Sequence, residues 1–262
     1  MCVVGLARGV TLLHDVVYIV CQSSSAIIRF SARTHERLTD INVEGMRYPR
    51  EIAACEQTSQ LYVTDIQVCI WRVLSEGEDI RRWWTQTPPD TFAPHTLSVT
   101  SSRLLVTSQY TQQLMQLDAA GEELRRFSLP DYMKYLSHAM ESPTGTFVIA
   151  HKNTQLMQWQ VSEVNTEGEV LHQFSRPHSY AKHIALDSQG NIFLADCYSC
   201  HILQLDAQLA LCRVIIDKHQ LNNKEPRRLC YNAQSGQLMV GLDFIGNDDT
   251  RSVVAVFDVL QR

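Results

Sequence analysis

The 262-residue sequence has no apolar run near the ~20 residues that a membrane-spanning helix requires, so it predicts no transmembrane segment and no membrane partner. Residues 1–6 lack the basic start and long apolar stretch of a secretory signal. Charged residues make up only 19% and hydrophobic residues 45%, which excludes a disordered chain and favours a large buried core. The net charge of −5 excludes a protein coated with positive charge, but it allows one basic face.

Established catalytic motifs are also absent. There is no glycine-rich phosphate loop, no Gly-x-Ser-x-Gly elbow and no His-Glu-x-x-His pair. The sequence therefore favours a protein that is not an enzyme and that carries no cofactor.

The eight cysteines do not resemble a disulfide framework, because most of them lie in apolar runs where a reduced thiol behaves as a small hydrophobe. This usage predicts a reducing compartment, the cytoplasm or the nucleus. Cys197, Cys200 and His201 formally match a haem-attachment motif and part of a zinc site, but no second Cys-x-x-Cys accompanies them. An inert loop, a redox pair and a metal site remain open for Cys197 and Cys200.

A short apolar run, rich in β-branched residues, recurs through the chain and is typical of a strand buried on both faces. Its six copies are residues 17–20, 61–64, 104–107, 147–150, 192–195 and 238–241. A second run precedes each copy, and its apolar anchors Val10, Ile52, Leu97, Ala139, Ile184 and Leu229 are spaced by 42 or 45 residues. A third run, such as residues 156–159, and a more polar fourth run follow.

Four strands in about 44 residues describe one blade of a β-propeller. We expect an all-β, single domain over residues 1–262, a six-bladed propeller of four-stranded antiparallel blades. The expected blades are residues 7–48, 49–93, 94–135, 136–180, 181–225 and 226–262. The last blade lacks a fourth strand, and we expect residues 1–6 to supply it and close the ring, which removes an exposed edge.

The fifth unit carries the most specific motif, residues 183–196 (HIALDSQGNIFLAD) followed by residues 202–206 (ILQLD). This resembles the NHL repeat, in which an apolar strand, an Asp-Gly-Asn-like turn and a strand ending in Asp follow one another. The second unit, ending in Asp65, matches in part. As repeat residues, Asp65 and Asp196 are expected to hold loops by accepting backbone N–H bonds. The resemblance implies the recognition propeller found at the end of tripartite-motif (TRIM-type) proteins, without the RING, B-box or coiled coil.

The loops that enter the innermost strands are expected to gather around one mouth of the central channel. The seven residues ending at each anchor contain eight Lys or Arg and only two acids, a charge of +6, which leaves −11 for the remaining chain. Aromatic and histidine side chains are interspersed among them. We predict a ligand-binding face formed by Tyr48, Arg50, His95, Tyr135, His138, Tyr180, Lys182, His183, Arg227 and Arg228.

Two kinds of ligand suit such a face. A protein or peptide would place carboxylates on the basic groups, and this is the function that we favour, in a domain expected to be monomeric. Single-stranded RNA would place phosphates there and stack its bases on the rings, as some TRIM-type NHL propellers do.

A metal-dependent enzyme is the third possibility. His95, His138 and His183 come from three neighbouring blades at nearly the same depth, and three imidazoles suit a catalytic zinc. Pro94-His95 resembles the ligand motif of the NHL-like peptidyl-hydroxyglycine lyase, and propeller lactonases are a further comparison. His138 and His183, however, lie one residue later than His95 relative to the apolar anchor, and such a shift changes the side on which a side chain lies.

Overall fold

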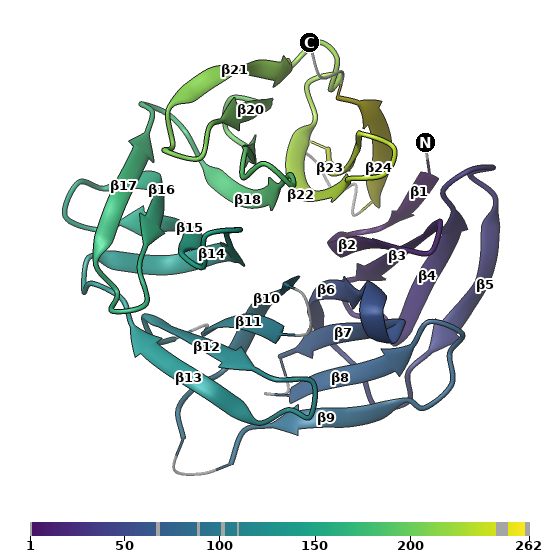
Figure 1. Ribbon diagram of the computed structural model, residues 1–262. Coiled ribbons are helices and arrows are strands. Elements are labelled where there is room, and N and C mark those ends of the chain that lie inside the picture. The colour runs from purple at the N-terminus through teal and green to yellow at the C-terminus, as the bar shows by residue number, and fades with distance from the viewer. Residues whose placement is uncertain are drawn as a thin grey trace.

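The computed structural model describes residues 2–66, 69–87, 90–100, 103–108, 110–244 and 251–259. These residues form six four-stranded antiparallel sheets arranged as blades around a central channel (Figure 1). The all-β, six-bladed propeller expected from the repeat is confirmed.

The first three blades follow one another in chain order, each running from its innermost to its outermost strand. Blade 1 contains β2 (Ala7–Leu13), β3 (Val16–Cys21), β4 (Ala26–Ser31) and β5 (Arg37–Asn42). Blade 2 contains β6 (Pro49–Cys55), β7 (Gln60–Asp65), β8 (Cys69–Leu74) and β9 (Arg81–Thr85). Blade 3 contains β10 (Pro94–Thr100), β11 (Arg103–Ser108), β12 (Gln113–Leu117) and β13 (Glu123–Ser128).

The other three blades repeat this order, except that the last one takes its outer strand from the other end of the chain. Blade 4 contains β14 (Met133–Glu141), β15 (Phe147–Asn153), β16 (Gln158–Val164) and β17 (Val170–Ser175). Blade 5 contains β18 (Ala181–Leu186), β19 (Ile192–Asp196), β20 (His201–Leu205) and β21 (Leu211–Ile216). Blade 6 contains β22 (Glu225–Asn232), β23 (Gln237–Asp243), β24 (Arg251–Asp258) and, outermost, β1 (Cys2–Gly5).

Strand β1 closes the ring as expected. It pairs antiparallel with β24, from Cys2 opposite Val254 to Gly5 opposite Arg251. The two ends of the described chain therefore meet in one sheet (Figure 1).

The hydrophobic core lies between neighbouring blades. One buried cluster, for example, joins Leu13 and Tyr18 of blade 1 to Ile52, Leu61 and Trp71 of blade 2. Because each second strand is covered by a blade on both sides, its apolar run is continuous rather than alternating. In the described part of the chain the one helix is the short 3₁₀ turn η1 (Glu56–Thr58), and no helix there is long and apolar enough to cross a membrane.

The third strand of blade 4 differs from the expectation for residues 156–159. Strand β16 begins at Gln158, because Val164 pairs with Phe147 and the ladder runs back from there. Leu156 and Met157 lie instead in the preceding turn, where Asn153 Oδ1 accepts the N–H of Leu156.

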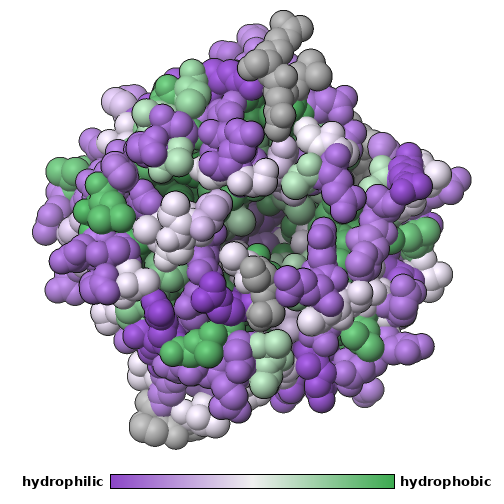
Figure 2. All heavy atoms as spheres, in the orientation of Figure 1, coloured by the Kyte–Doolittle hydropathy of each residue, from purple (hydrophilic) through white to green (hydrophobic). Residues whose placement is uncertain are grey.

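Two kinds of loop emerge at the same end of the blades: those joining a second to a third strand and those joining one blade to the next. We call this end the top face and the opposite end the bottom face. The centre of the disc is hollowed, as the space-filling view down the channel shows (Figure 2).

Candidate ligand-binding site

Buried aspartates fix the loops that carry two of the predicted aromatic residues. The carboxylate of Asp65 accepts the N–H groups of Arg47 and Tyr48 at 2.9 and 3.2 Å, and that of Asp196 accepts the Tyr180 N–H at 2.8 Å. Both aspartates are completely buried. The structural role expected of these repeat residues is confirmed, and it places Tyr48 and Tyr180 on the top face.

Every innermost strand shifts its register near its top end. The shifts lie between Ala7 and Gly9, Pro49 and Glu51, Pro94 and Leu97, Lys134 and His138, Ala181 and His183, and Pro226 and Arg228. A β-bulge of this kind redirects side chains, and here it does so at six equivalent places around the channel.

The repeat thus divides the channel residues into two sets. The positions two residues before the apolar anchors are Arg8, Arg50, His95, Ser137, Lys182 and Arg227. The positions one residue before the anchors are Gly9, Glu51, Thr96, His138, His183 and Arg228. The predicted histidine triad mixed the two sets.

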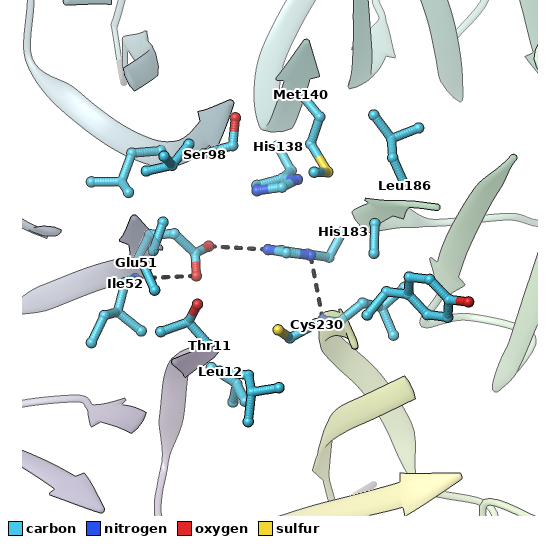
Figure 3. A pocket seen from close by; sticks show the side chains of 18 of the residues that line it. Thr11, Leu12, Glu51, Ile52, Ser98, His138, Met140, His183, Leu186 and Cys230 are labelled. Atoms are coloured by element: carbon cyan, nitrogen blue, oxygen red, sulfur yellow. Dashed lines mark hydrogen bonds and ion pairs between the residues drawn. The ribbon is translucent and has the colours of Figure 1, made fainter. Parts of the chain in front are cut away.

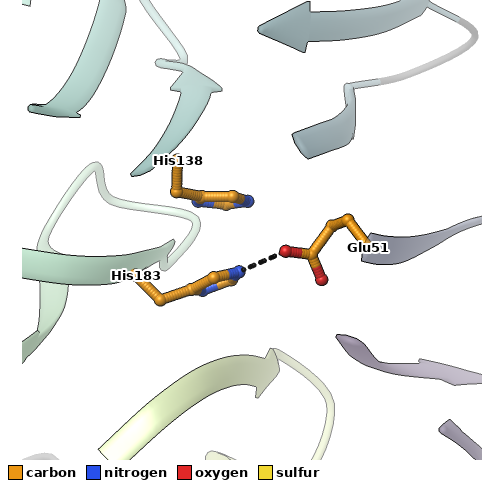
Figure 4. Close-up of side chains that lie close together, drawn as sticks. All are labelled: Glu51, His138 and His183. Carbon is orange, nitrogen blue, oxygen red and sulfur yellow. Dashed lines mark hydrogen bonds and ion pairs between the residues drawn. The ribbon is translucent and has the colours of Figure 1, made fainter. Parts of the chain in front are cut away.

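Glu51, His138, His183 and Arg228, which we call the channel cluster, meet inside the channel (Figure 4 shows the first three). The Nε2 atom of His183 lies 3.2 Å from Glu51 Oε2, and Arg228 Nε lies 3.5 Å from the same oxygen. The rings of His138 and His183 stack with centroids 3.6 Å apart. All four side chains are buried.

The hydrogen bonds of His183 determine which ring nitrogen carries its proton. The Leu229 N–H donates to His183 Nδ1 at 3.3 Å, so this nitrogen is an acceptor. In the neutral ring Nε2 must then carry the hydrogen, which it donates to Glu51. Burial keeps the ring neutral, because it lowers the pKa of His183 well below its usual value, with Arg228 and Lys182 adding to the effect.

Glu51 and His138 are also shifted toward their neutral forms. Burial, followed by the neighbouring His183, lowers the pKa of His138 well below its usual value. Burial raises the pKa of Glu51, although Arg228 and His138 oppose that shift. Arg228 is therefore the permanent positive charge of the cluster.

The residues that converge as possible metal ligands are Glu51, His138 and His183, whose candidate atoms lie within 4.8 Å of one another. The predicted third histidine, His95, is not among them: its Nδ1 lies 3.2 Å from the Leu136 carbonyl oxygen. The donor set fits a metal poorly, because a metal on His183 Nε2 would displace the proton to Nδ1, which faces the Leu229 N–H.

A separate concavity of about 480 Å³, the top-face pocket, lies on blades 3, 4 and 5. It is lined by His95, Tyr110, Tyr135, Leu136, Ser137, Lys152, Trp159, Tyr180 and Lys182.

Aromatic rings and lysines alternate in the top-face pocket. Trp159 and Tyr180 stack with centroids 4.2 Å apart, and the Nζ of Lys182 lies 5.5 Å from the Tyr180 ring centroid. The Nζ of Lys152 lies 5.9 Å from the ring centroid of Tyr135, whose side chain is 69% exposed. Such a pocket offers flat apolar surface beside cations, which suits a ligand that is both anionic and apolar.

The predicted binding residues fall into three groups. His95, Tyr135, Tyr180 and Lys182 line the top-face pocket. His138, His183 and Arg228 are buried in the channel cluster. Arg50 and Arg227 occupy the same repeat position as Arg8, near the channel mouth. Tyr48 is exposed in the loop between blades 1 and 2 and lies outside the pocket.

Part of the basic charge at the channel mouth is neutralised. Arg227 pairs with Glu225 and with Asp243, and Arg228 pairs with Glu51. Lys182 loses its proton more easily than an ordinary lysine, because burial and then Arg228 lower its pKa to about 8. The top face therefore carries less unpaired positive charge than the number of its basic residues indicates.

Several contributors to these sites were not in the predicted set, among them Glu51, Trp159 and Lys152. Glu51 occupies the same repeat position as His138 and His183, so its place in the channel cluster could have been predicted from the spacing. Trp159 follows an apolar run and carries no pattern that separates it from the core. Lys152 lies at the end of β15, and its proximity to Tyr135 depends on the blade 4 bulge.

The Cys197–Cys200 segment shows no feature of a reactive site. Both thiols are reduced and buried, and the Cys197 Sγ–H donates to the Pro226 carbonyl at 2.8 Å. Burial raises the pKa of Cys197 to about 12, so its thiolate, the form that attacks disulfides or binds metals, is disfavoured.

Comparisons with known proteins show the fold. No family model matches the chain, and no curated protein sequence matches it. Among solved structures, a nidogen/laminin complex aligns with a TM-score of 0.68 and 16% identity over 82% of each chain. The virginiamycin B lyase of Staphylococcus aureus aligns with a TM-score of 0.68 and 13% identity over 100% of this chain and 88% of the lyase. The chain is thus similar to propellers described both in a protein complex and as an enzyme.

Proposed function

We propose that this propeller is a non-enzymatic recognition module that binds a protein partner through its top face, with an acidic and apolar peptide segment of the partner entering the top-face pocket. One observation carries the proposal: exposed apolar side chains gather on this face. Of the 13 exposed large hydrophobic residues among those described, eight lie on the top face, seven in its loops and Tyr135 in the bulge of β14. They are Tyr48, Ile66, Tyr110, Tyr135, Leu156, Met157, Tyr198 and Phe244.

Clustered exposed apolar residues with a polar surround are typical of protein interfaces. Tyrosines are also enriched among the residues that dominate binding energy. The pocket between them supplies Lys152 and Lys182 for a carboxylate of the partner. This combination favours a few anchoring contacts at one place on the ring.

Single-stranded RNA is supported less well. A phosphate chain needs a continuous track of unpaired cations, but Glu225 pairs with Arg227 at the channel mouth, and Arg228 is buried in the channel with Glu51. The protein in the nidogen/laminin complex shares this fold, and the resemblance to TRIM-type NHL repeats is consistent with a recognition role.

The test is a selection of random 12-residue peptides displayed on phage against the propeller. We expect enriched peptides to combine an acidic residue with aromatic or aliphatic residues. We expect the affinity of a synthetic copy to fall about tenfold or more in Tyr135→Ala and in Lys182→Gln. Arg33→Gln, which removes a positive charge from the bottom face, is the matched control and should leave the affinity unchanged.

A pool of random 12-nucleotide single-stranded RNAs provides the opposing measurement. Saturable RNA binding that weakens with salt at a slope of about −0.7 per phosphate, without enrichment of any peptide, would overturn the proposal in favour of RNA. If the peptides bind the Tyr135→Ala and Lys182→Gln variants as tightly as the wild type, the interface lies elsewhere.

A further inference from the structure

A second concavity, the channel cavity, lies beneath the channel cluster and extends toward the bottom face. Figure 3 shows side chains that line it. It has a volume of about 360 Å³. Its inner end is formed by Glu51, His138 and His183, and Glu56 and Gln57 of η1 line it near the bottom face. It shares no lining residue with the top-face pocket.

The cavity differs in charge from the top face. Within the described part of the chain, no lysine or arginine lines it, whereas two carboxyl groups, Glu51 and Glu56, do. Its lining mixes polar and apolar residues, among them Thr11, Ser98, Met140 and Cys230. The anchors Ile52, Leu97, Ile184 and Leu229 also border it, but they pack in the hydrophobic clusters between blades. The cavity is therefore a space of mixed polar and apolar lining with acidic groups at both ends.

Two buried polar atoms of cavity-lining residues have no hydrogen-bond partner among the described residues. They are Ser98 Oγ and His138 Nδ1, and each residue is less than 5% exposed. An unpaired buried polar atom is unfavourable, so a site that contains two of them gains when a ligand or water satisfies them.

Glu51 also retains capacity to accept hydrogen bonds. His183 and Arg228 both approach Oε2, whereas the one bond that Oε1 accepts from the described residues is a long one of 3.4 Å from the Ile52 N–H. A small group with several N–H donors can bond Glu51 Oε1 and a neighbouring acceptor together.

We propose that the channel cavity binds a small primary amine in its ammonium form, with its apolar body between the inner strands and its cationic head at Glu51 beside His138 and Ser98. An ammonium group meets a carboxylate there, and a short hydrocarbon chain can pack against apolar lining residues such as Met140 and Cys230. The site is independent of the protein-binding top face.

The experiment uses n-hexylamine as the probe, with sodium hexanoate and 1-hexanol as probes of equal chain length. Binding at pH 7.5 is followed by calorimetry and by the imidazole NMR signals. We expect hexylamine to bind saturably with 1:1 stoichiometry and hexanoate not to bind. Glu51→Gln should weaken hexylamine binding at least tenfold.

Two further variants locate the site. Ser98→Ala removes an unpartnered hydroxyl, so it should fold normally and weaken hexylamine binding by a few fold. Glu78→Gln removes an exposed acid from a bottom-face loop outside the cavity and should leave binding unchanged. If Glu51→Gln fails to fold, the wild type, Ser98→Ala and the hexanoate comparison still decide the question.

The proposal is overturned if hexylamine and hexanoate bind equally, or if hexylamine binding is not saturable up to about 10 mM. It is also overturned if Glu78→Gln weakens binding as much as Glu51→Gln, because the attraction would then be general charge. Hexanol binding as tightly as the amine would show that only the apolar walls recognise the ligand.

Discussion

Glu51 and Arg228 meet across the channel, although the innermost strands that carry them belong to blades 2 and 6 and blade 1 lies between them. The blade 1 residue at the equivalent repeat position is Gly9. A Cβ atom on Gly9 would lie 2.7 Å from Glu51 Oε1 and 2.6 Å from the Ile52 nitrogen. The missing side chain therefore leaves the space through which carboxylate and guanidinium approach each other.

The first prediction concerns this ion pair. Arg228→Met leaves Glu51 buried without its cation and should lower the free energy of unfolding by about 3–5 kcal/mol, measured by urea denaturation. Arg33→Met, which removes an exposed partner of Asp15, should cost less than about 1 kcal/mol. The double variant with Glu51→Gln should recover part of the loss. A loss below about 1 kcal/mol in Arg228→Met would contradict a structural role for the pair.

The second prediction concerns the space at Gly9. Gly9→Ala should destabilise the protein by about 1–3 kcal/mol, because backbone atoms of β6 would have to move. Gly5→Ala is the matched control: a Cβ there would meet only Cys21, with its nearest atom at an ordinary 3.6 Å. Equal thermal midpoints for the two variants would show that the channel relaxes freely around residue 9.

The third prediction is a loss of stability in acid. Burial lowers the pKa of His95 and of His151 to about 4, and it lowers the pKa values of His138 and His183 well below 6.5. Below about pH 6.5 these histidines bind protons in the unfolded chain but stay neutral in the folded chain. The free energy of unfolding therefore decreases by about 1.4 kcal/mol for each histidine and each unit by which the pH is lowered. The raised pKa of Glu51 acts in the opposite sense and offsets about one proton.

Urea denaturation between pH 7 and pH 4.5 measures this slope. His151→Gln removes one histidine that lies outside both sites and should flatten the slope by about 1.4 kcal/mol per pH unit. A slope unchanged in this variant would mean that His151 titrates normally in the folded state.

The fourth prediction concerns Lys182. Because its pKa is lowered to about 8, its positive charge is lost as the pH rises from 7 to 9. Affinity for an acidic peptide selected on the top face should fall roughly tenfold over that range, since a charged hydrogen bond is lost. Lys182→Arg keeps its charge at pH 9 and should remove the pH dependence. A wild-type affinity that is constant from pH 7 to 9 would exclude Lys182 from the interface.

The blades were predictable because their signal is hydrophobic and repeated. Each second strand is covered on both sides, so its continuous apolar run appears in the sequence at a spacing of about 44 residues. The turn at Leu156 and Met157 escaped prediction because an exposed apolar pair has the same composition as a strand.

The sites were less predictable because they depend on register. The β-bulges that direct His95 away from His138 and His183 cannot be recognised from the residue types at those positions. A register shift of one residue nevertheless changes which partners a side chain contacts. The pairing of Arg228 with Glu51 joins residues 177 positions apart, so counting basic residues overestimated the free positive charge.

The pairing of β1 with β24 has a consequence for the order in which the molecule can be completed. During synthesis β1 emerges first, yet the strand it pairs with is made last, so β1 waits through the production of five complete blades. A permuted chain that begins at β2 and carries β1 after β24 would keep every sheet and make blade 6 from consecutive segments. Such a chain should refold faster than the natural order, because blade 6 would no longer need a distant segment to complete its sheet, although β2 would still have to meet β22 and β23 to close the ring.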